Sequence, residues 1–194
     1  MSSSREKILS LIRENQPASI PKPELNFEKQ RFENPVERFC ELVEMVGGMT
    51  RIVKAEENLL EFSNISEKDK VLSALKLIPD QNIDRQNIKT AHDMKDIDFC
   101  CFHVDLAVAE NGAFLSPCED FDFRSVYFLA QHLIVTLKAA DIKNNMHEAY
   151  EALGKMERGE FSAFISGPSK TADIEQCLVI GAHGARSLQV FIYE

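Results

Sequence analysis

The segment from Phe161 to Glu194 constrains the fold more than any other part of the sequence. Residues 161–165 form a short apolar run, which predicts a buried strand. Residues 166–171 then supply glycine, proline and hydroxyl side chains, which predict a loop that leads into a capped helix. Gly181–Gly184 forms a second turn before an apolar strand at 188–193. Strand, polar glycine loop, helix and strand is how α/β proteins build a ligand site at the carboxyl edge of a sheet.

Apolar periodicity upstream predicts further alternation of strands and helices. The Asn34-Pro35 pair is a strong helix start, and Asn111-Gly112 is a strong hairpin signal. Expected helices lie at residues 2–15, 34–47, 66–78, 124–129, 144–153 and from Thr171 onward, and expected strands at 49–53, 97–104, 105–109, 113–115 and 132–137. Many of these runs are too apolar to be half exposed. They predict an α/β protein with three layers, α/β/α, around a mainly parallel, Rossmann-like sheet.

Two parts of the chain differ in composition. Residues 1–30 hold a helix with an apolar stripe at Ile8, Leu9, Leu11 and Ile12, followed by a proline-rich connector. Residues 31–194 are long enough for a single α/β domain with its own core. We interpret the first helix as an arm that docks on another chain. The alternative is a helix that packs on its own domain.

Charge and cysteine content exclude several classes of function. The net charge of −9 disfavours binding to nucleic acid or to an anionic membrane surface. The sequence lacks a stretch of signal-peptide or membrane-spanning length, which predicts a cytoplasmic protein. Its five cysteines include no Cys-x-x-Cys pair, and no Gly-x-Gly-x-x-Gly fingerprint occurs. We therefore expect free thiols, and no iron–sulfur cluster, flavin or other cofactor in this chain.

Two motifs near the C-terminus carry a resemblance to a known family. Residues Ile165–Glu175 read ISGPSKTADIE, and Val179–Gly184 read VIGAHG. Together they resemble the C-terminal signature of the lactate-utilisation protein C family, whose members carry the LUD domain. Ala109–Ala113 matches a further segment of that family. The resemblance covers residues 90–194 well and the N-terminal half loosely.

The resemblance implies a fold and a function. The fold would be the one shared by sugar-phosphate isomerases, CoA transferases and formyltetrahydrofolate cyclo-ligases. The function would be that of an accessory, non-redox component of L-lactate utilisation, acting with iron–sulfur partner proteins that convert L-lactate to pyruvate. Two alternatives stay open: a stand-alone enzyme for a phosphorylated or CoA-linked small molecule, and a ligand-binding module without catalysis.

The loop at residues 166–171 is the first candidate for a ligand site. Backbone N–H groups near a helix start, with hydroxyls and a lysine, can hold a phosphate or carboxylate. The site prediction includes Ser166, Gly167, Ser169, Lys170 and Thr171, together with Glu110 and Gly112 of the upstream turn. We expect these residues to line one pocket. The alternative is a helix cap with a tight turn, which needs the same residue types.

Glu110 and His183 are the candidates for catalysis. In CoA transferases of the implied fold, a glutamate in a Glu-Asn-Gly-like turn forms the acyl adduct, and Glu110-Asn-Gly112 has the same lettering. The alternative is a turn residue that accepts hydrogen bonds from neighbouring N–H groups. His183 lies between two glycines and could reach a cleft, while His132 matches a histidine that the family often carries. No His-x-x-x-His or His-x-x-Glu pattern indicates a metal, so none is expected.

Overall fold

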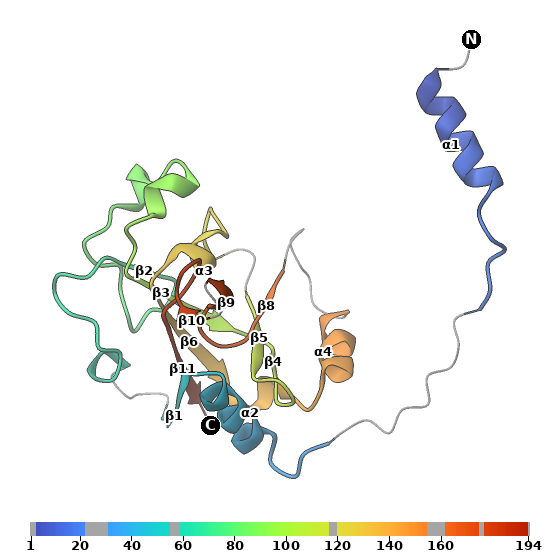
Figure 1. Ribbon diagram of the computed structural model, residues 1–194. Coiled ribbons are helices and arrows are strands. Elements are labelled where there is room, and N and C mark those ends of the chain that lie inside the picture. The colour runs from blue at the N-terminus through green and yellow to red at the C-terminus, as the bar shows by residue number, and fades with distance from the viewer. Residues whose placement is uncertain are drawn as a thin grey trace.

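The structure is a computed structural model that describes residues 3–21, 31–54, 59–116, 120–154, 162–174 and 177–193. Its centre is a parallel sheet of five strands in the order β1-β11-β6-β3-β2 (Figure 1). These strands are β1 (Met49–Val53), β2 (Val71–Ser73), β3 (Phe99–Val104), β6 (His132–Lys138) and β11 (Ser187–Tyr193). The prediction of an α/β fold built on a mainly parallel sheet is confirmed.

Two smaller sheets complete the strand content of the described residues. A mixed sheet of four strands has the order β7-β4-β5-β8, and a two-stranded hairpin joins β9 to β10. Their bounds are β4 (Ala107–Val108), β5 (Ala113–Leu115), β7 (Ile142–Lys143), β8 (Phe164–Ile165), β9 (Lys170–Ile174) and β10 (Cys177–Ile180). β4 and β5 pair antiparallel through the Asn111-Gly112 turn, so the predicted hairpin is confirmed.

The described part of the chain also contains four α-helices and four 3₁₀ turns. The helices are α1 (Ser4–Glu14), α2 (Pro35–Met45), α3 (Val126–Leu129) and α4 (Met146–Leu153), and the 3₁₀ turns are Leu59–Glu61, Arg85–Asn87, Ala91–Met94 and Ala139–Asp141. Asparagine caps fix two of the helix starts. The side chains of Asn34 and Asn145 accept hydrogen bonds from the N–H groups of Glu37 and Glu148. The predicted helix start at Asn34 is confirmed.

The layers follow from which side chains are buried on each side of the central sheet. One face packs against α2, α3 and the four-stranded sheet, with Phe39, Phe102 and Phe114 wholly buried between them. The other face is covered by the segment that contains Leu59 and Ile78. α4 packs on the far side of the four-stranded sheet. Both faces of the parallel sheet are therefore buried, as its apolar strands require.

The predicted helix at residues 66–78 is wrong. The structure has strand β2 there, paired in parallel with β3. Val71 and Leu72 fit a helical stripe in the sequence, but Val71 belongs to the core on one face of the sheet and Leu72 to the core on the other. A short apolar run buried on two opposite faces cannot be told from a helix by periodicity alone.

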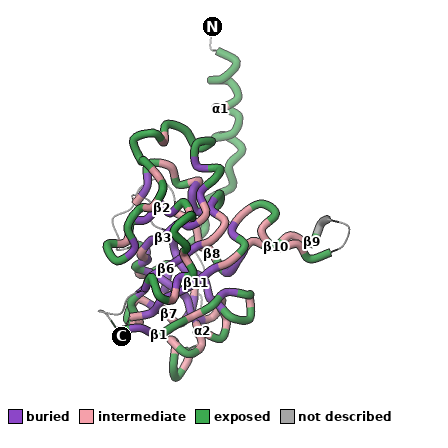
Figure 2. Tube along the Cα trace, turned by 90° about the vertical axis from the view of Figure 1, so that its left-hand side faces the viewer, coloured by how far each residue is buried: buried purple, intermediate pink, exposed green. Residues whose placement is uncertain are grey.

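The predicted helix after Thr171 is also wrong. Residues 170–174 form β9, which pairs antiparallel with β10. The apolar run at 177–180 supplies a partner strand, so the backbone groups of β9 are satisfied by pairing instead of by a helical turn. The hairpin projects from the body in Figure 2, and Leu178 and Ile180 on it are exposed.

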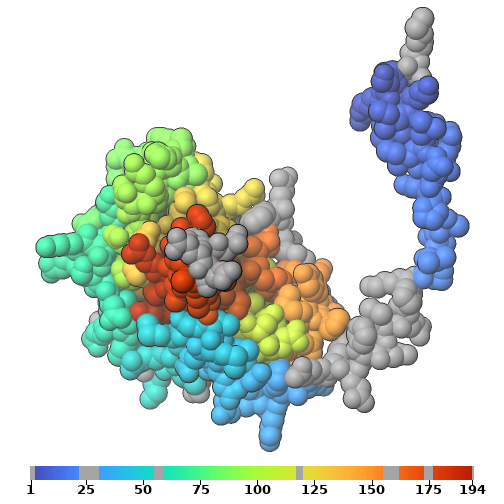
Figure 3. All heavy atoms as spheres, viewed as in Figure 1, coloured from blue at the N-terminus to red at the C-terminus, as the bar shows by residue number. Residues whose placement is uncertain are grey.

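The N-terminal helix stands apart from the α/β body in Figures 1 and 3. α1 has no buried residue, and Ile8, Leu11 and Ile12 are exposed. Ser3 and Glu6 form a capping box that fixes where α1 begins. None of the helices that the structure describes is both long enough and apolar enough to cross a membrane.

Candidate functional site

The predicted site loop lies at the amino end of the central sheet. The Ser169 N–H donates to the Ala185 carbonyl over 2.8 Å, and the Gly181 N–H donates to the Ser169 carbonyl over 2.9 Å. Ala185 and Gly181 both precede β11, so this loop sits where β11 begins. We expected it at the carboxyl edge, and that placement is wrong. The reason is that β9 and β10 form a hairpin, which carries the chain back to the start of β11 without the crossover helix that the prediction assumed.

The structure brings the loop next to the upstream turn. The Ser166 hydroxyl donates to the Asn111 carbonyl over 2.9 Å. Gly112 and Gly167 both have positive φ, at 64° and 72°. Both glycines lie close to the C-terminal end of α2. A Cβ added at Gly112 would lie 2.9 Å from the Val43 nitrogen, and one added at Gly167 would lie 2.6 Å from the side chain of Val46, the residue after α2. We call residues 110–112, 166–171 and 181–184 the glycine loops.

The Glu110 side chain forms a hydrogen bond with the start of helix α4. Its carboxylate accepts a hydrogen bond of 2.8 Å from the Met146 N–H, at the first residue of α4. The Glu110 N–H in turn donates to the Asn144 carbonyl over 3.1 Å. A carboxylate at this position is stabilised by the positive end of the helix dipole. This geometry favours the alternative of a turn residue that binds neighbouring N–H groups, and the nucleophile stays a prediction without a geometric argument.

Lys170 and His183 lie at the surface of the glycine loops, and Thr171 lies half-buried in β9. Lys170 is exposed, and its ammonium lies beside Gly47, just past the C-terminal end of α2. The negative end of the α2 dipole favours a cation there, which gives Lys170 a structural partner. His183 is exposed, and the neighbouring Gly184 packs against the Ser169 side chain. The arrangement gathers Lys170 and His183 at one end of the molecule, and anion binding there remains a prediction.

His132 and Ser187 form a pair beside the glycine loops. They are register partners at the amino ends of β6 and β11, and His132 Nδ1 lies 2.8 Å from the Ser187 hydroxyl. The ring stacks on Phe99 with centroids 4.8 Å apart. Burial lowers the pKa of His132, and the nearby Arg186 lowers it further. Both effects favour the neutral form of the imidazole.

This pair leads to a prediction about acid stability. As the pH falls from about 7 to about 5, we expect the wild-type protein to lose more stability than the His132→Gln variant. Because the folded-state pKa is lowered, the contribution of His132 is complete above its ordinary pKa of about 6.5 and is lost as the pH falls through the folded value. Urea unfolding across this range measures it, with His92→Gln, at an exposed histidine, as the control. Equal pH slopes for wild type and His132→Gln would contradict the prediction.

Sequence reasoning missed a polar cluster at the opposite edge of the sheet. His103 lies near the carboxyl end of β3, Asp105 follows directly, and Asp141 ends the 3₁₀ turn after β6. Their ligand atoms all lie within 4.8 Å of one another. The signal in the sequence was the His103-x-Asp105 pair at the end of an apolar strand. Asp141 could not be joined to it without the pairing of β3 with β6.

Comparison with known proteins agrees with this architecture. The parallel central sheet, packed against a four-stranded sheet, defines an α/β protein. The crystal structure of a DUF162 family protein from Deinococcus radiodurans has a similar fold. That crystal structure superposes with a TM-score of 0.61 at 15% identity, covering 82% of this chain and 96% of the other. The family model described as LUD domain matches residues 3–193. The chain belongs to the LUD domain family.

One relative is similar over part of this chain. Lactate utilization protein C from Bacillus pumilus (strain SAFR-032) is 35% identical over 85 residues. The matched region is 41% of this chain and 35% of that protein. This chain therefore matches about a third of the length of the relative.

Proposed function

We propose that the protein is a component of L-lactate utilisation that acts together with partner proteins. The observation that carries the proposal is the match of the LUD domain over residues 3–193. The similarity to lactate utilization protein C points to the same process. The place of action would be the cytoplasm.

In the finer form of the proposal, the partners are iron–sulfur proteins and this chain is a non-redox component. Cys100 and Cys101 are adjacent on β3 and are buried in the cores on opposite faces of the sheet. Burial raises the pKa of Cys101 to about 12 and also raises that of Cys100. Because the two side chains lie on opposite faces of the sheet, they do not offer a pair of ligands to one cluster. Because lactate oxidation removes two electrons, a partner must carry the redox group.

The arm supplies a surface for such a partner. α1 is amphipathic and has no buried residue, and its apolar side chains Ile8, Leu11 and Ile12 are exposed. An amphipathic helix binds by laying its apolar face into a hydrophobic groove of another protein. We propose that the iron–sulfur partner provides this groove. The glycine loops, with Lys170 and His183 at their surface, would hold any small anionic ligand of the assembly.

The test is growth on L-lactate as the sole carbon source. Deleting the gene should abolish growth, and restoring the intact gene should rescue it. Normal growth of the deletion strain, with no redundant lactate oxidase present, would show that the assignment to lactate utilisation is wrong. Turnover of a phosphorylated or CoA-linked compound by the purified chain alone would instead favour a stand-alone enzyme.

The arm is tested separately by co-purification with the partners. We expect loss of co-purification on deletion of residues 1–16, and on the double change Ile8→Ser with Ile12→Ser. The matched control is Ser10→Ala with Arg13→Ser, two exposed positions that by helical spacing lie on the opposite side of α1. Because α1 buries nothing, these variants should unfold like wild type. Unchanged co-purification of the double apolar variant would end the docking proposal and leave the pathway assignment intact.

A further inference from the structure

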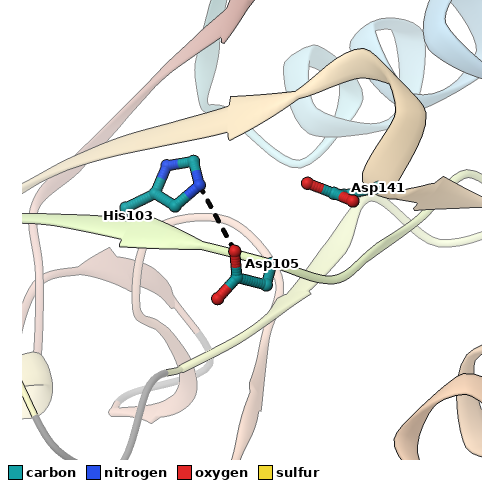
Figure 4. Close-up of side chains that lie close together, drawn as sticks. All are labelled: His103, Asp105 and Asp141. Atoms are coloured by element: carbon teal, nitrogen blue, oxygen red, sulfur yellow. Dashed lines mark ion pairs between the residues drawn. The ribbon is translucent and has the colours of Figure 1, made fainter. Parts of the chain in front are cut away.

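The carboxyl edge of the central sheet carries a group of side chains suited to a divalent cation. Figure 4 shows His103, Asp105 and Asp141 turned toward one another from β3, from the residue after it and from the turn after β6. The His103 Nε2 lies 3.5 Å from an Asp105 carboxylate oxygen. Cations bind where nitrogen and oxygen donors converge, and in α/β proteins ligands bind at this edge.

The spacing of the three donors fits one ion. Two ligands of one metal, each bonded at about 2.1 Å, lie roughly 3 to 3.5 Å apart when they are not opposite each other. The His103–Asp105 separation of 3.5 Å is at this value. All three donors lie within 4.8 Å of one another, so bringing them to the spacing of ligands on one ion needs a movement of about 1 Å. Asp105 is exposed and Asp141 is partly exposed, which leaves both carboxylates free to make that movement.

A buried hydroxyl orients the imidazole. His103 Nδ1 lies 2.9 Å from the hydroxyl of Thr136, which is 2% exposed on the neighbouring strand β6. A hydroxyl both donates and accepts, so Thr136 can accept from Nδ1–H while Nε2 offers its lone pair to an ion. Metal-bound histidines almost always donate their second ring N–H to a hydrogen-bond acceptor, and the Thr136 hydroxyl oxygen can take that role. The contact with Thr136 lies outside the three proposed ligands, and it fixes Nε2 on the side of the carboxylates.

We propose that His103, Asp105 and Asp141 bind one divalent first-row transition ion, such as Mn²⁺ or Zn²⁺. One imidazole and two carboxylates suit these ions better than Mg²⁺, which prefers oxygen donors alone. The three protein ligands leave further coordination positions open to solvent, because the cluster is only partly buried. The ion would lie at the edge opposite the glycine loops and would be independent of them.

The experiment is a titration of the tag-free full-length protein with MnCl₂, followed by the electron paramagnetic resonance signal of free Mn²⁺. We expect one tightly bound equivalent, which Zn²⁺ displaces because it binds nitrogen and oxygen sites more strongly. His103→Ala and Asp141→Asn should each weaken binding at least about tenfold. Thr136→Val should keep the stoichiometry and weaken binding about tenfold, because only the orientation of the ring is lost.

The matched controls are His92→Ala and Asp96→Asn, an exposed histidine and an exposed carboxylate outside the cluster. Both should bind Mn²⁺ as wild type does. Circular dichroism and unfolding midpoints check that each variant is folded. If His103→Ala does not fold, Asp105→Asn takes its place in the titration, because the Asp105 side chain is 68% exposed. Absence of stoichiometric Mn²⁺ binding to the wild type would overturn the proposal. So would wild-type affinity in both Asp105→Asn and Asp141→Asn.

Discussion

Replacing Phe102 by alanine lowers the free energy of unfolding by about 3 to 5 kcal/mol. Phe102 is wholly buried on β3, in the central sheet. Its ring lies edge-on to Tyr127 of α3, with centroids 4.7 Å apart, and 6.1 Å from the ring of Phe114 in the four-stranded sheet. The side chain thus joins three parts of the fold. Its removal costs both the burial of an aromatic ring and the cavity that remains.

The matched control is Phe128→Ala, one residue beyond Tyr127 on α3. Phe128 is 42% exposed, so the same change of side chain should cost no more than about 1 kcal/mol. Urea unfolding followed by circular dichroism measures both variants against wild type. A loss at Phe102 that is no larger than the loss at Phe128 would mean that the two sheets do not share one core.

Replacing Gly112 by alanine lowers the free energy of unfolding by about 2 to 4 kcal/mol. Gly112 has a φ of 64°, a conformation that a side chain disfavours. An added Cβ would also lie 2.9 Å from the Val43 nitrogen and 3.1 Å from the Leu42 carbonyl carbon. Both neighbours are backbone atoms of α2, which cannot turn away as a flexible side chain could. The hairpin or α2 must therefore shift.

Gly154→Ala is the control for this change. Gly154 ends α4 with a φ of −64°, and an added Cβ would meet its nearest neighbours at 3.6 Å, an ordinary contact. Alanine at such a position restricts the unfolded chain and should stabilise the protein by about 0.4 to 1 kcal/mol. If the two variants differed from wild type by the same amount and in the same direction, the close approach of Gly112 to α2 would be refuted.

Much of the fold could be predicted because its signals are local. The Asn34-Pro35 start of α2 and the Asn111-Gly112 turn depend on a few adjacent residues, and the structure has both. The apolar runs at 132–137 and 188–193 became the two neighbouring strands at the centre of the sheet. Continuous apolar runs of this length mark strands that are buried on both faces.

The errors arose where a partner distant in the sequence decides the structure. Val71 and Leu72 form a strand because β3 pairs with them. Lys170 and Thr171 form a strand because β10 pairs with them. Nothing in either segment alone favours the strand strongly, since polar and apolar residues recur there at spacings that also suit a helix.

The candidate site was predictable only in part for the same reason. The sequence indicated that the Ser166 loop and the Glu110 turn belong together, and the bond from Ser166 to Asn111 joins the two segments. It did not indicate that Glu110 would face the start of α4. Nor could it bring Asp141 to His103, because that contact depends on two strands that lie side by side only in the folded sheet.

The strand order has a consequence for how the chain acquires its structure during synthesis. β1 is made early, yet its only neighbour in the sheet is β11, near the other end of the described chain. Until β11 emerges from the ribosome, β1 has no strand partner in the sheet and β6 lacks one of its two neighbours. Pairings this far apart in sequence form slowly, and open strand edges invite aggregation in the meantime. The nascent protein therefore depends on β11 to close the sheet, and shelter by a chaperone would matter most just before that strand is made.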